Sequence, residues 1–238
     1  MASSTTQALM YLFGFALLAG ILAFVVWMYV TQDKKKEEMA KAKVFSEGIP
    51  ASEYFGCSTA AECVETVERN NSRRLLYNGG LKHATPQYMM EVYGVPCDNA
   101  SCALLSTTLA PHMGFEEVGK LGQIYGFKPF LRAVDRALSS LNDHNPFLYS
   151  IITTHSGCFY CRNIRGRNVY SHHAYGTALD IRINDTLDTW KDGRLMKGLY
   201  ELANYAVREG IYWGGSFTRE DGMHFEVSHN FTEHVRQQ

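Results

Sequence analysis

The pattern of apolar and polar positions divides the chain into parts of different character. Residues 1–32 contain no charged side chain, and residues 8–30 are an almost unbroken apolar run. A helix of about 20 residues spans the roughly 30 Å hydrocarbon core of a bilayer, so this run is long enough to cross a membrane. Tyr11, Trp27 and Tyr29 lie near its ends, where aromatic rings favour the membrane interface. The pattern therefore predicts one N-terminal transmembrane helix.

A cleaved signal peptide is the main alternative for this segment. Signal peptides usually carry a basic n-region and a shorter apolar stretch than residues 8–30 provide. No basic residue precedes the run, and no convincing small-residue cleavage site follows Val30. A helix of a soluble domain is disfavoured because the run has no polar face. We therefore expect an uncleaved anchor that places the lipid membrane among the partners of the chain.

Charged positions dominate the next segment, residues 33–50, which we interpret as a stalk or linker. Residues 33–43 are rich in Lys and Glu and predict a helix. Gly48 and Pro50 then break the helical pattern. The segment therefore separates the anchor from the remainder of the chain.

Residues 51–145 combine helical and irregular sequence, which predicts the N-terminal part of the ectodomain. Ser58 can cap a short helix that ends at about residue 69. Residues 78–109 are rich in Gly, Pro, Ser and Thr, so we expect irregular structure there. A longer helix is predicted over residues 128–141, because apolar residues recur at helical spacing. These residues are Phe130, Leu131, Val134, Leu138 and Leu141.

Residues 146–238 carry mixed strand and helix patterns. The β-branched and aromatic residues at 147–154 predict a buried strand. A helix is predicted over residues 194–209, with Gly210 at its C′ position. Further short strands are predicted at residues 177–183, 211–213 and 223–228. Because strands and helices do not alternate regularly, the pattern predicts an α+β fold with a largely antiparallel sheet.

Composition limits the classes of function. The 23 basic and 24 acidic side chains give a formal net charge of -1, so no basic excess would attract nucleic acid. Aromatic residues make up 13% of the chain, which suits a packed globular core rather than a disordered chain. We therefore expect no nucleic-acid partner.

Six cysteines fall into three close pairs along the chain. The simplest scheme is local pairing in an oxidising compartment, with Cys57–Cys63, Cys97–Cys102 and Cys158–Cys161 as the disulfides. Cys158 and Cys161 alone would also suit a redox centre, but no βαβ pattern surrounds them. A zinc knuckle that joins this pair to Cys97 and Cys102 remains open, as do six unrelated thiols.

Three side chains in the last third of the chain have the composition of a catalytic zinc site. His173, Asp180 and His224 supply two imidazoles and one carboxylate, and a catalytic zinc takes three protein ligands of these types. A turn at Gly176 can bring His173 and Asp180 to one metal. The chain has nine histidines, so some proximity of His and Asp is also expected by chance.

A metal-assisted hydrolase also needs a general base. Asp221 lies three residues before His224, close enough to take a proton from an attacking water without being a ligand. Glu226 lies two residues after His224, on the same strand face, and can orient a ligand or bind a substrate amine. The alternative is a purely structural role, in which Asp221 and Gly222 form a turn.

Three sequence blocks carry a resemblance to a known family. The blocks are SxHxxGxAxD from Ser171 to Asp180, WGG at Trp213, and DxxHFE from Asp221 to Glu226. In this order they resemble the superfamily of zinc D-alanyl-D-alanine carboxypeptidases and L-alanyl-D-glutamate endopeptidases. Bacterial cell-wall enzymes and phage endolysins belong to that superfamily, and the hedgehog signalling domain shares its fold. The resemblance covers roughly the last hundred residues.

The resemblance implies roles for particular residues. His173, Asp180 and His224 would bind Zn²⁺, and Asp221 would be the catalytic base. Arg162 is the candidate most similar to the arginine that stabilises the oxyanion, although Arg165 and Arg167 lie close by. Substrate binding or support of the ligands is expected of Ser171, Trp213 and Glu226. The insertion flanked by cysteines resembles the extensin-like and phage-associated branches of the superfamily.

The expected function is therefore a membrane-anchored zinc metallopeptidase that acts on the stem peptides of peptidoglycan, with residues 146–238 as its catalytic core. The alternative is an inactive hedgehog-like module that binds zinc and serves wall attachment or assembly. Lys34, Lys35 and Lys36 would place the domain in the cytoplasm by the positive-inside rule, whereas the cysteines favour an oxidising compartment. We expect a location outside the cytoplasm or in a membrane-containing virion of a bacterial virus.

Overall fold

The computed structural model describes residues 56–237. The predicted transmembrane helix and charged stalk, residues 1–50, lie outside this range. Within it, no helix combines the length and the apolar character that a membrane span requires.

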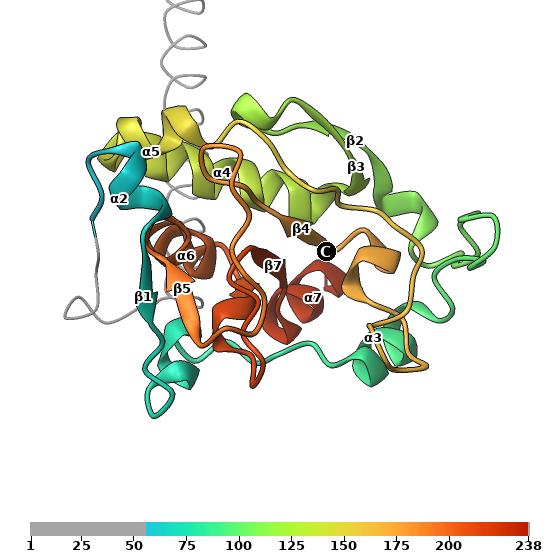
Figure 1. The fold of residues 1–238 in the computed structure, drawn as a ribbon. Helices are drawn as coiled ribbons and strands as arrows, with labels where there is room; N and C mark the ends of the chain where they lie inside the picture. Colours follow the sequence, from blue (N-terminus) through green and yellow to red (C-terminus); the bar gives the residue numbers. More distant parts are fainter. Residues whose placement is uncertain (1–55, 238) are drawn as a thin grey trace, which may run out of the picture. The chain divides into compact units, whose positions relative to one another are not determined.

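A three-stranded antiparallel sheet lies at the centre of the C-terminal half (Figure 1). Its strand order is β4-β7-β6. The strands are β4 (Ala178–Asp180), β6 (Ile211–Trp213) and β7 (His224–Val227). Asp180 lies directly opposite His224 in the register of β4 and β7. The predicted antiparallel strands are thus confirmed, and their pairing brings two candidate ligands together.

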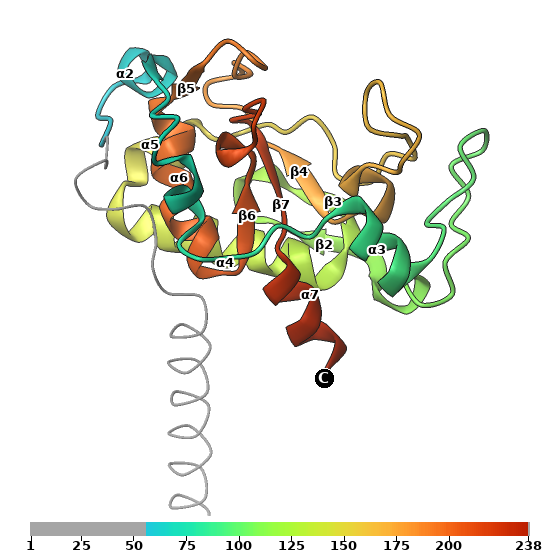
Figure 2. The same ribbon diagram turned by 90° about the horizontal axis from the view of Figure 1, so that it is seen from below.

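Two long helices cover one face of this sheet (Figure 2). They are α4 (Lys128–His144) and α6 (Lys197–Arg208). Phe225 of β7 packs among their apolar side chains, including Val134 and Leu202. Because successive strand residues point to opposite faces, His224 and Glu226 point away from these helices. The helix predicted over residues 128–141 is confirmed. Because α4 and α6 cover one face of the sheet, the polar side chains of β7 lie on the other face.

Elements from the first part of the chain pack into the same unit. Strand β1 (Thr66–Glu68) pairs antiparallel with β5 (Arg194–Met196), although more than a hundred residues separate them. Strands β2 (Met113–Glu117) and β3 (Gln123–Phe127) form an antiparallel hairpin. The other α-helices of the described range are α2 (Ala60–Val64), α3 (Pro86–Tyr93), α5 (Pro146–Ile151) and α7 (His229–Arg236). Single-turn 3₁₀ helices lie at Arg74–Asn78, Ala110–His112, Gly119–Leu121, His172–Tyr175 and Gly214–Ser216.

The strand predicted over residues 147–154 is wrong, because the chain forms helix α5 there. Pro146 occupies the first turn, where its missing N–H costs no hydrogen bond. The Asn145 side chain accepts a hydrogen bond from the Leu148 backbone N–H at 2.9 Å. These start signals outweigh the β-branched composition of the segment.

Three predicted boundaries also differ from the structure. The first helix is capped by Thr59 rather than Ser58, and it ends at Val64, because the chain turns into β1. Residues 78–109 include helix α3, which Thr85 caps and Pro86 begins. The helix predicted over residues 194–209 loses its first three residues to β5, because they pair with β1.

Residues 56–237 contain two disulfides. Cys57–Cys63 is confirmed, with 5.1 Å between the Cα atoms. The predicted pairs Cys97–Cys102 and Cys158–Cys161 are wrong, because Cys97 bonds Cys161 and leaves Cys102 and Cys158 as thiols. The buried Cys158 Sγ faces the Gly176 carbonyl oxygen at 3.1 Å, in the core. Cys161 instead meets the loop that carries Cys97, so the CxxC spacing does not decide the pairing.

Loss of the Cys97–Cys161 disulfide is expected to destabilise the domain. It closes a loop of 64 residues, and removal of a native disulfide typically costs about 2–5 kcal/mol. The double variant C97A/C161A should therefore lose about 2–5 kcal/mol of unfolding free energy in urea titrations. C102A is the matched control and should unfold like the wild type, because Cys102 is exposed and unbonded. A Cys97–Cys102 peptide in non-reducing digests would contradict this pairing.

Candidate metal centre and active site

The first candidate ligand is held in a tight 3₁₀ turn. Ser171 caps the turn, since its hydroxyl accepts a hydrogen bond from the His173 backbone N–H at 3.4 Å. Gly176 ends the turn with φ of 64°, a left-handed conformation that favours glycine. A Cβ at this position would also lie 2.8 Å from Met113 Cε and 3.0 Å from the Phe127 nitrogen. The turn therefore leads directly into β4, which carries Asp180.

The three predicted ligands come together in space. His173, Asp180 and His224 each offer one ligand atom, and these atoms lie within 4.8 Å of one another. Asp180 Oδ1 lies 2.8 Å from His224 Nδ1 and 3.3 Å from His173 Nε2. Both imidazoles are almost fully buried, and the carboxylate is partly exposed. Two rings and one partly exposed carboxylate thus lie close enough to share one metal ion.

Hydrogen bonds fix which imidazole nitrogens face this point. His173 Nδ1 lies 3.0 Å from the Cys158 carbonyl oxygen, so this nitrogen carries the proton and donates. The opposite nitrogen, Nε2, is buried and has no hydrogen-bond partner among residues 56–237. His224 Nε2 faces Glu226 Oε2 at 2.9 Å, which leaves Nδ1 toward Asp180. An imidazole nitrogen with an unshared lone pair and a neighbouring carboxylate oxygen are ligand types that zinc binds.

The electrostatics of the cluster favour a positive charge at its centre. Burial by itself raises the pKa of Asp180, but the imidazoles of His173 and His224 beside it hold this pKa far below the usual range. Burial lowers the pKa of His224, yet Asp180 and Glu226 raise it well above its ordinary value. The carboxylates therefore stabilise a cation between them, and the residues present fit a bound Zn²⁺.

The predicted base lies beside these ligands. Its backbone is fixed by a hydrogen bond from the Asp221 N–H to the Gly214 carbonyl oxygen at 3.0 Å. Asp221 Oδ1 is buried and lacks a hydrogen-bond partner in the described part of the chain. Burial raises the pKa of Asp221, and the nearby carboxylate of Asp180 adds to this rise. A carboxylate with an unused oxygen and a raised pKa can accept a proton from water.

Glycine and tryptophan hold the turn that carries Asp221. A Cβ on Gly214 would lie 2.5 Å from the Asp221 carbonyl oxygen and 3.1 Å from His224 Cβ. The Trp213 indole N–H donates to the Gly222 carbonyl oxygen at 2.7 Å. Trp213 itself is fully buried, so it supports the turn rather than contacting substrate. The WGG block thus has a structural reason to accompany the base.

Arg162 lies at the surface of the loop that follows Cys161. Its carbonyl oxygen accepts a hydrogen bond from the Ser171 N–H at 3.0 Å, which ties this loop to the turn of His173. Its expected role as an oxyanion stabiliser stays a prediction. Ser171 is buried and acts through the backbone of His173.

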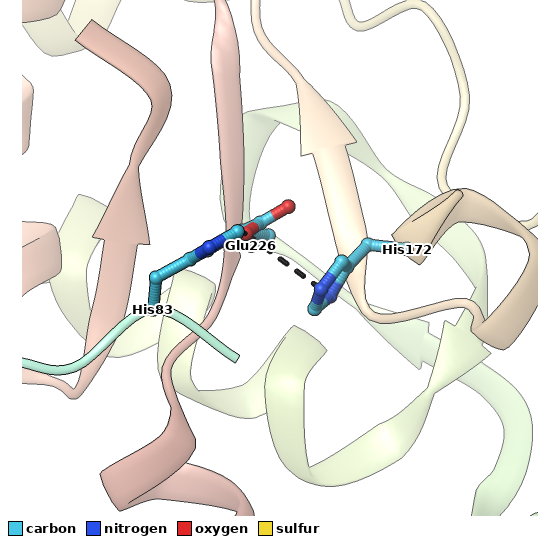
Figure 3. A group of neighbouring side chains, drawn as sticks. All are labelled: His83, His172 and Glu226. Atoms are coloured by element: carbon cyan, nitrogen blue, oxygen red, sulfur yellow. Dashed lines mark ion pairs between the residues drawn. The ribbon is translucent and has the colours of Figure 1, made fainter. Parts of the chain in front are cut away.

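Glu226 belongs to a second group of side chains that the sequence does not reveal (Figure 3). His83 and His172 lie on either side of Glu226 in this view, and the three offer ligand atoms within 4.8 Å. His83 comes from the segment before α3, where no motif marks it. Only its closeness to Glu226 in the fold brings it to the site.

A second buried carboxylate, which the sequence does not single out, lies next to the turn that carries Asp221. Asp188 is 3% exposed, and a Cβ on Gly222 would lie 2.0 Å from its Oδ2. Burial raises the pKa of Asp188 to about 7. Since the unfolded chain releases this proton near pH 4, the folded state holds more protons between about pH 4 and 7. The contribution of Asp188 to stability therefore decreases as pH rises through this window.

Asp188→Asn is expected to stabilise the folded domain at pH 7 and above. The amide is nearly isosteric and does not have to ionise in a buried position. Unfolding free energies measured from pH 4 to 8 should show a smaller decline with pH in the variant than in the wild type. Asp143→Asn, at an exposed position on α4, provides the control and should keep the wild-type slope. Equal slopes for Asp188→Asn and wild type would show that Asp188 ionises normally.

A buried carboxylate beside a His₂Asp ligand set is the arrangement of a candidate metal-dependent hydrolase. Residues 165–227 match the family model described as D-alanyl-D-alanine carboxypeptidase, which is about a quarter of the chain. The matched segment contains His173, Asp180, Asp221 and His224, and it supports a peptidoglycan-related peptidase of this superfamily. Neither the curated proteins nor the solved structures include a significant match to the chain.

Proposed function

We propose that this chain is a membrane-anchored zinc metallopeptidase that hydrolyses peptide bonds in the stem peptides of peptidoglycan. The observation that carries the proposal is the position of Asp221. Its buried, unpartnered oxygen accompanies three ligand atoms that lie within 4.8 Å of one another. A module that only bound zinc would need the three ligands but not this carboxylate.

The chemistry follows from the side chains. Bound zinc would supply a Lewis acid that polarises the scissile carbonyl and makes a nearby water more acidic. Asp221 takes a proton from the attacking water as its oxygen bonds the carbonyl carbon. The carboxyl group of Asp221 then delivers this proton to the leaving amine as the C–N bond breaks. Arg162 is the proposed electrophile for the oxyanion.

Location and anchoring belong to the same proposal. The disulfides Cys57–Cys63 and Cys97–Cys161 favour an oxidising compartment for the domain. We propose that residues 8–30 cross a membrane and hold the domain outside the cytoplasm or in a membrane-containing virion. A protease added to intact cells or virions should then remove the domain. Protection of the domain until the membrane is dissolved would place it inside.

The test of activity uses the full-length chain in detergent with purified peptidoglycan. Mass spectra of the released fragments should show shortened stem peptides with new amine and carboxylate ends. A chelator should abolish their release and added zinc should restore it. Zinc binding without any release, from intact peptidoglycan and from isolated stem peptides, would contradict the peptidase and favour the inactive hedgehog-like module.

A further inference from the structure

We propose that His83 is a positioning residue of the metal centre, because it holds Glu226, which in turn fixes the ring of His224. The inference rests on the proposed function, in which His224 is a metal ligand. His83 lies outside the segment that matches the peptidase family, residues 165–227. The N-terminal part of the ectodomain would thus complete a site that the matched segment only partly builds.

The first of the two contacts links Glu226 to His224, the proposed metal ligand. The two residues lie on one face of β7, with His224 Nε2 at 2.9 Å from Glu226 Oε2. When Nε2 donates its proton to Glu226, Nδ1, which lies 2.8 Å from Asp180 Oδ1, is the nitrogen that would bind a metal. The carboxylate therefore selects both the tautomer and the ring orientation that a metal needs.

The second contact links Glu226 to His83. The Glu226 side chain is only 4% exposed, so its second oxygen, Oε1, needs a partner from the protein. His83 Nε2 lies 2.8 Å from this oxygen, and the His83 side chain remains 37% exposed. His83 thus compensates a buried negative charge from the solvent side.

His172 is less able to do this. Its Nε2 lies 3.7 Å from Glu226 Oε1 but only 2.7 Å from the Ala84 carbonyl oxygen, to which it donates. Its Nδ1 faces the Thr177 hydroxyl at 3.2 Å, so both nitrogens have partners. These bonds also make a second metal between His83, His172 and Glu226 unfavourable.

The backbone and neighbouring rings hold His83 in place. The segment pairs with the end of β7 through a bridge between His83 and Ser228. The His229 N–H donates to the Lys82 carbonyl oxygen at 2.8 Å. Ring centroids of Tyr212 and Phe217 lie 5.2 Å and 5.3 Å from that of His83. The imidazole is therefore pre-positioned against Glu226 before any metal binds.

The experiment measures zinc affinity of the full-length, metal-stripped chain by competition with a chromophoric chelator. His83→Ala should weaken zinc binding by about 10- to 100-fold, the usual cost of losing an outer partner of a metal ligand. His83→Gln should restore most of the affinity, because its amide N–H can donate to Glu226. His144→Ala is the control for loss of an exposed histidine and should bind like the wild type. Circular dichroism verifies that each variant is folded.

A double-mutant cycle isolates the contact path. Glu226→Gln should weaken binding by itself, and His83→Ala should then add little, since its effect passes through Glu226. Wild-type zinc affinity in His83→Ala would overturn the proposal, as would additive losses in the double variant. Binding of two zinc ions, one of which is lost in His83→Ala, would instead assign His83 as a ligand and also overturn it. Zinc affinity is measured without substrate. A wild type that is inactive, but whose zinc affinity depends on the contact between His83 and Glu226, would therefore contradict only the peptidase.

Discussion

Asp180→Asn is expected to remove zinc from the site and abolish hydrolysis. Asp180 Oδ1 lies 2.8 Å from His224 Nδ1 and 3.3 Å from His173 Nε2, so within residues 56–237 it is the one negative group that both rings contact. The amide is neutral and a weaker ligand, and its NH₂ group can point toward the ring lone pairs. Loss of an outer partner costs about 10- to 100-fold in metal affinity, so loss of this ligand should cost at least about a hundredfold.

Metal content after gel filtration and chelator competition would measure this loss. Asp185→Asn is the matched control, since Asp185 lies in the exposed loop after β4 and its Oδ1 accepts a hydrogen bond only from the nearby Thr154 hydroxyl among the described residues. The control should keep one zinc per chain. If Asp180→Asn retained zinc at wild-type affinity, the ligand set would have to be reassigned.

Periodicity predicts the helices and strands that bury a continuous apolar face. The apolar side chains of α4 recur at helical spacing because they pack over the sheet, so the helix can be predicted from the sequence. Helix α5 has no such pattern over its six residues, and its composition favours a strand. Its helical state depends on Asn145 and Pro146, whose start signals are local and easily outweighed by composition.

The candidate ligands can be predicted from sequence because the elements that carry them are close along the chain. His173 and Asp180 are seven positions apart with a glycine turn between them, and antiparallel pairing then places His224 opposite Asp180. The spacing of the motifs therefore encodes the geometry. The position of Asp221 can be predicted for the same reason, because the turn before β7 fixes this residue near the ligands.

Contacts between distant segments cannot be predicted in this way. His83 reaches Glu226 across 143 positions of sequence only because its segment pairs with the end of β7. The Cys97–Cys161 disulfide joins two loops whose closeness depends on the whole fold. The Cys158 carbonyl oxygen that orients His173 has no side-chain signal at all. The His83 contact and the disulfide connect the motif-bearing part of the chain to the earlier part, where no pattern marks the site.

Asp221→Asn is expected to lower the rate of hydrolysis by about a hundred- to ten-thousand-fold while the chain keeps its zinc. The amide is nearly isosteric with the carboxylate, so the turn held by Gly214 and Trp213 should survive. An amide cannot take the water proton or return it to the leaving amine, which removes both proton transfers. Release of stem-peptide fragments per bound zinc would measure the change.

This outcome separates the base from the ligands, since Asp180→Asn loses metal whereas Asp221→Asn should lose only turnover. Asp192→Asn, at an exposed position of a neighbouring loop, is the control and should retain wild-type rates. Wild-type rates in Asp221→Asn would show that another group accepts the proton. Loss of zinc in this variant would mean that the buried oxygen of Asp221 contributes to the metal site itself. The two measurements together therefore decide whether the carboxylate that carries the proposed function acts on the substrate or on the metal.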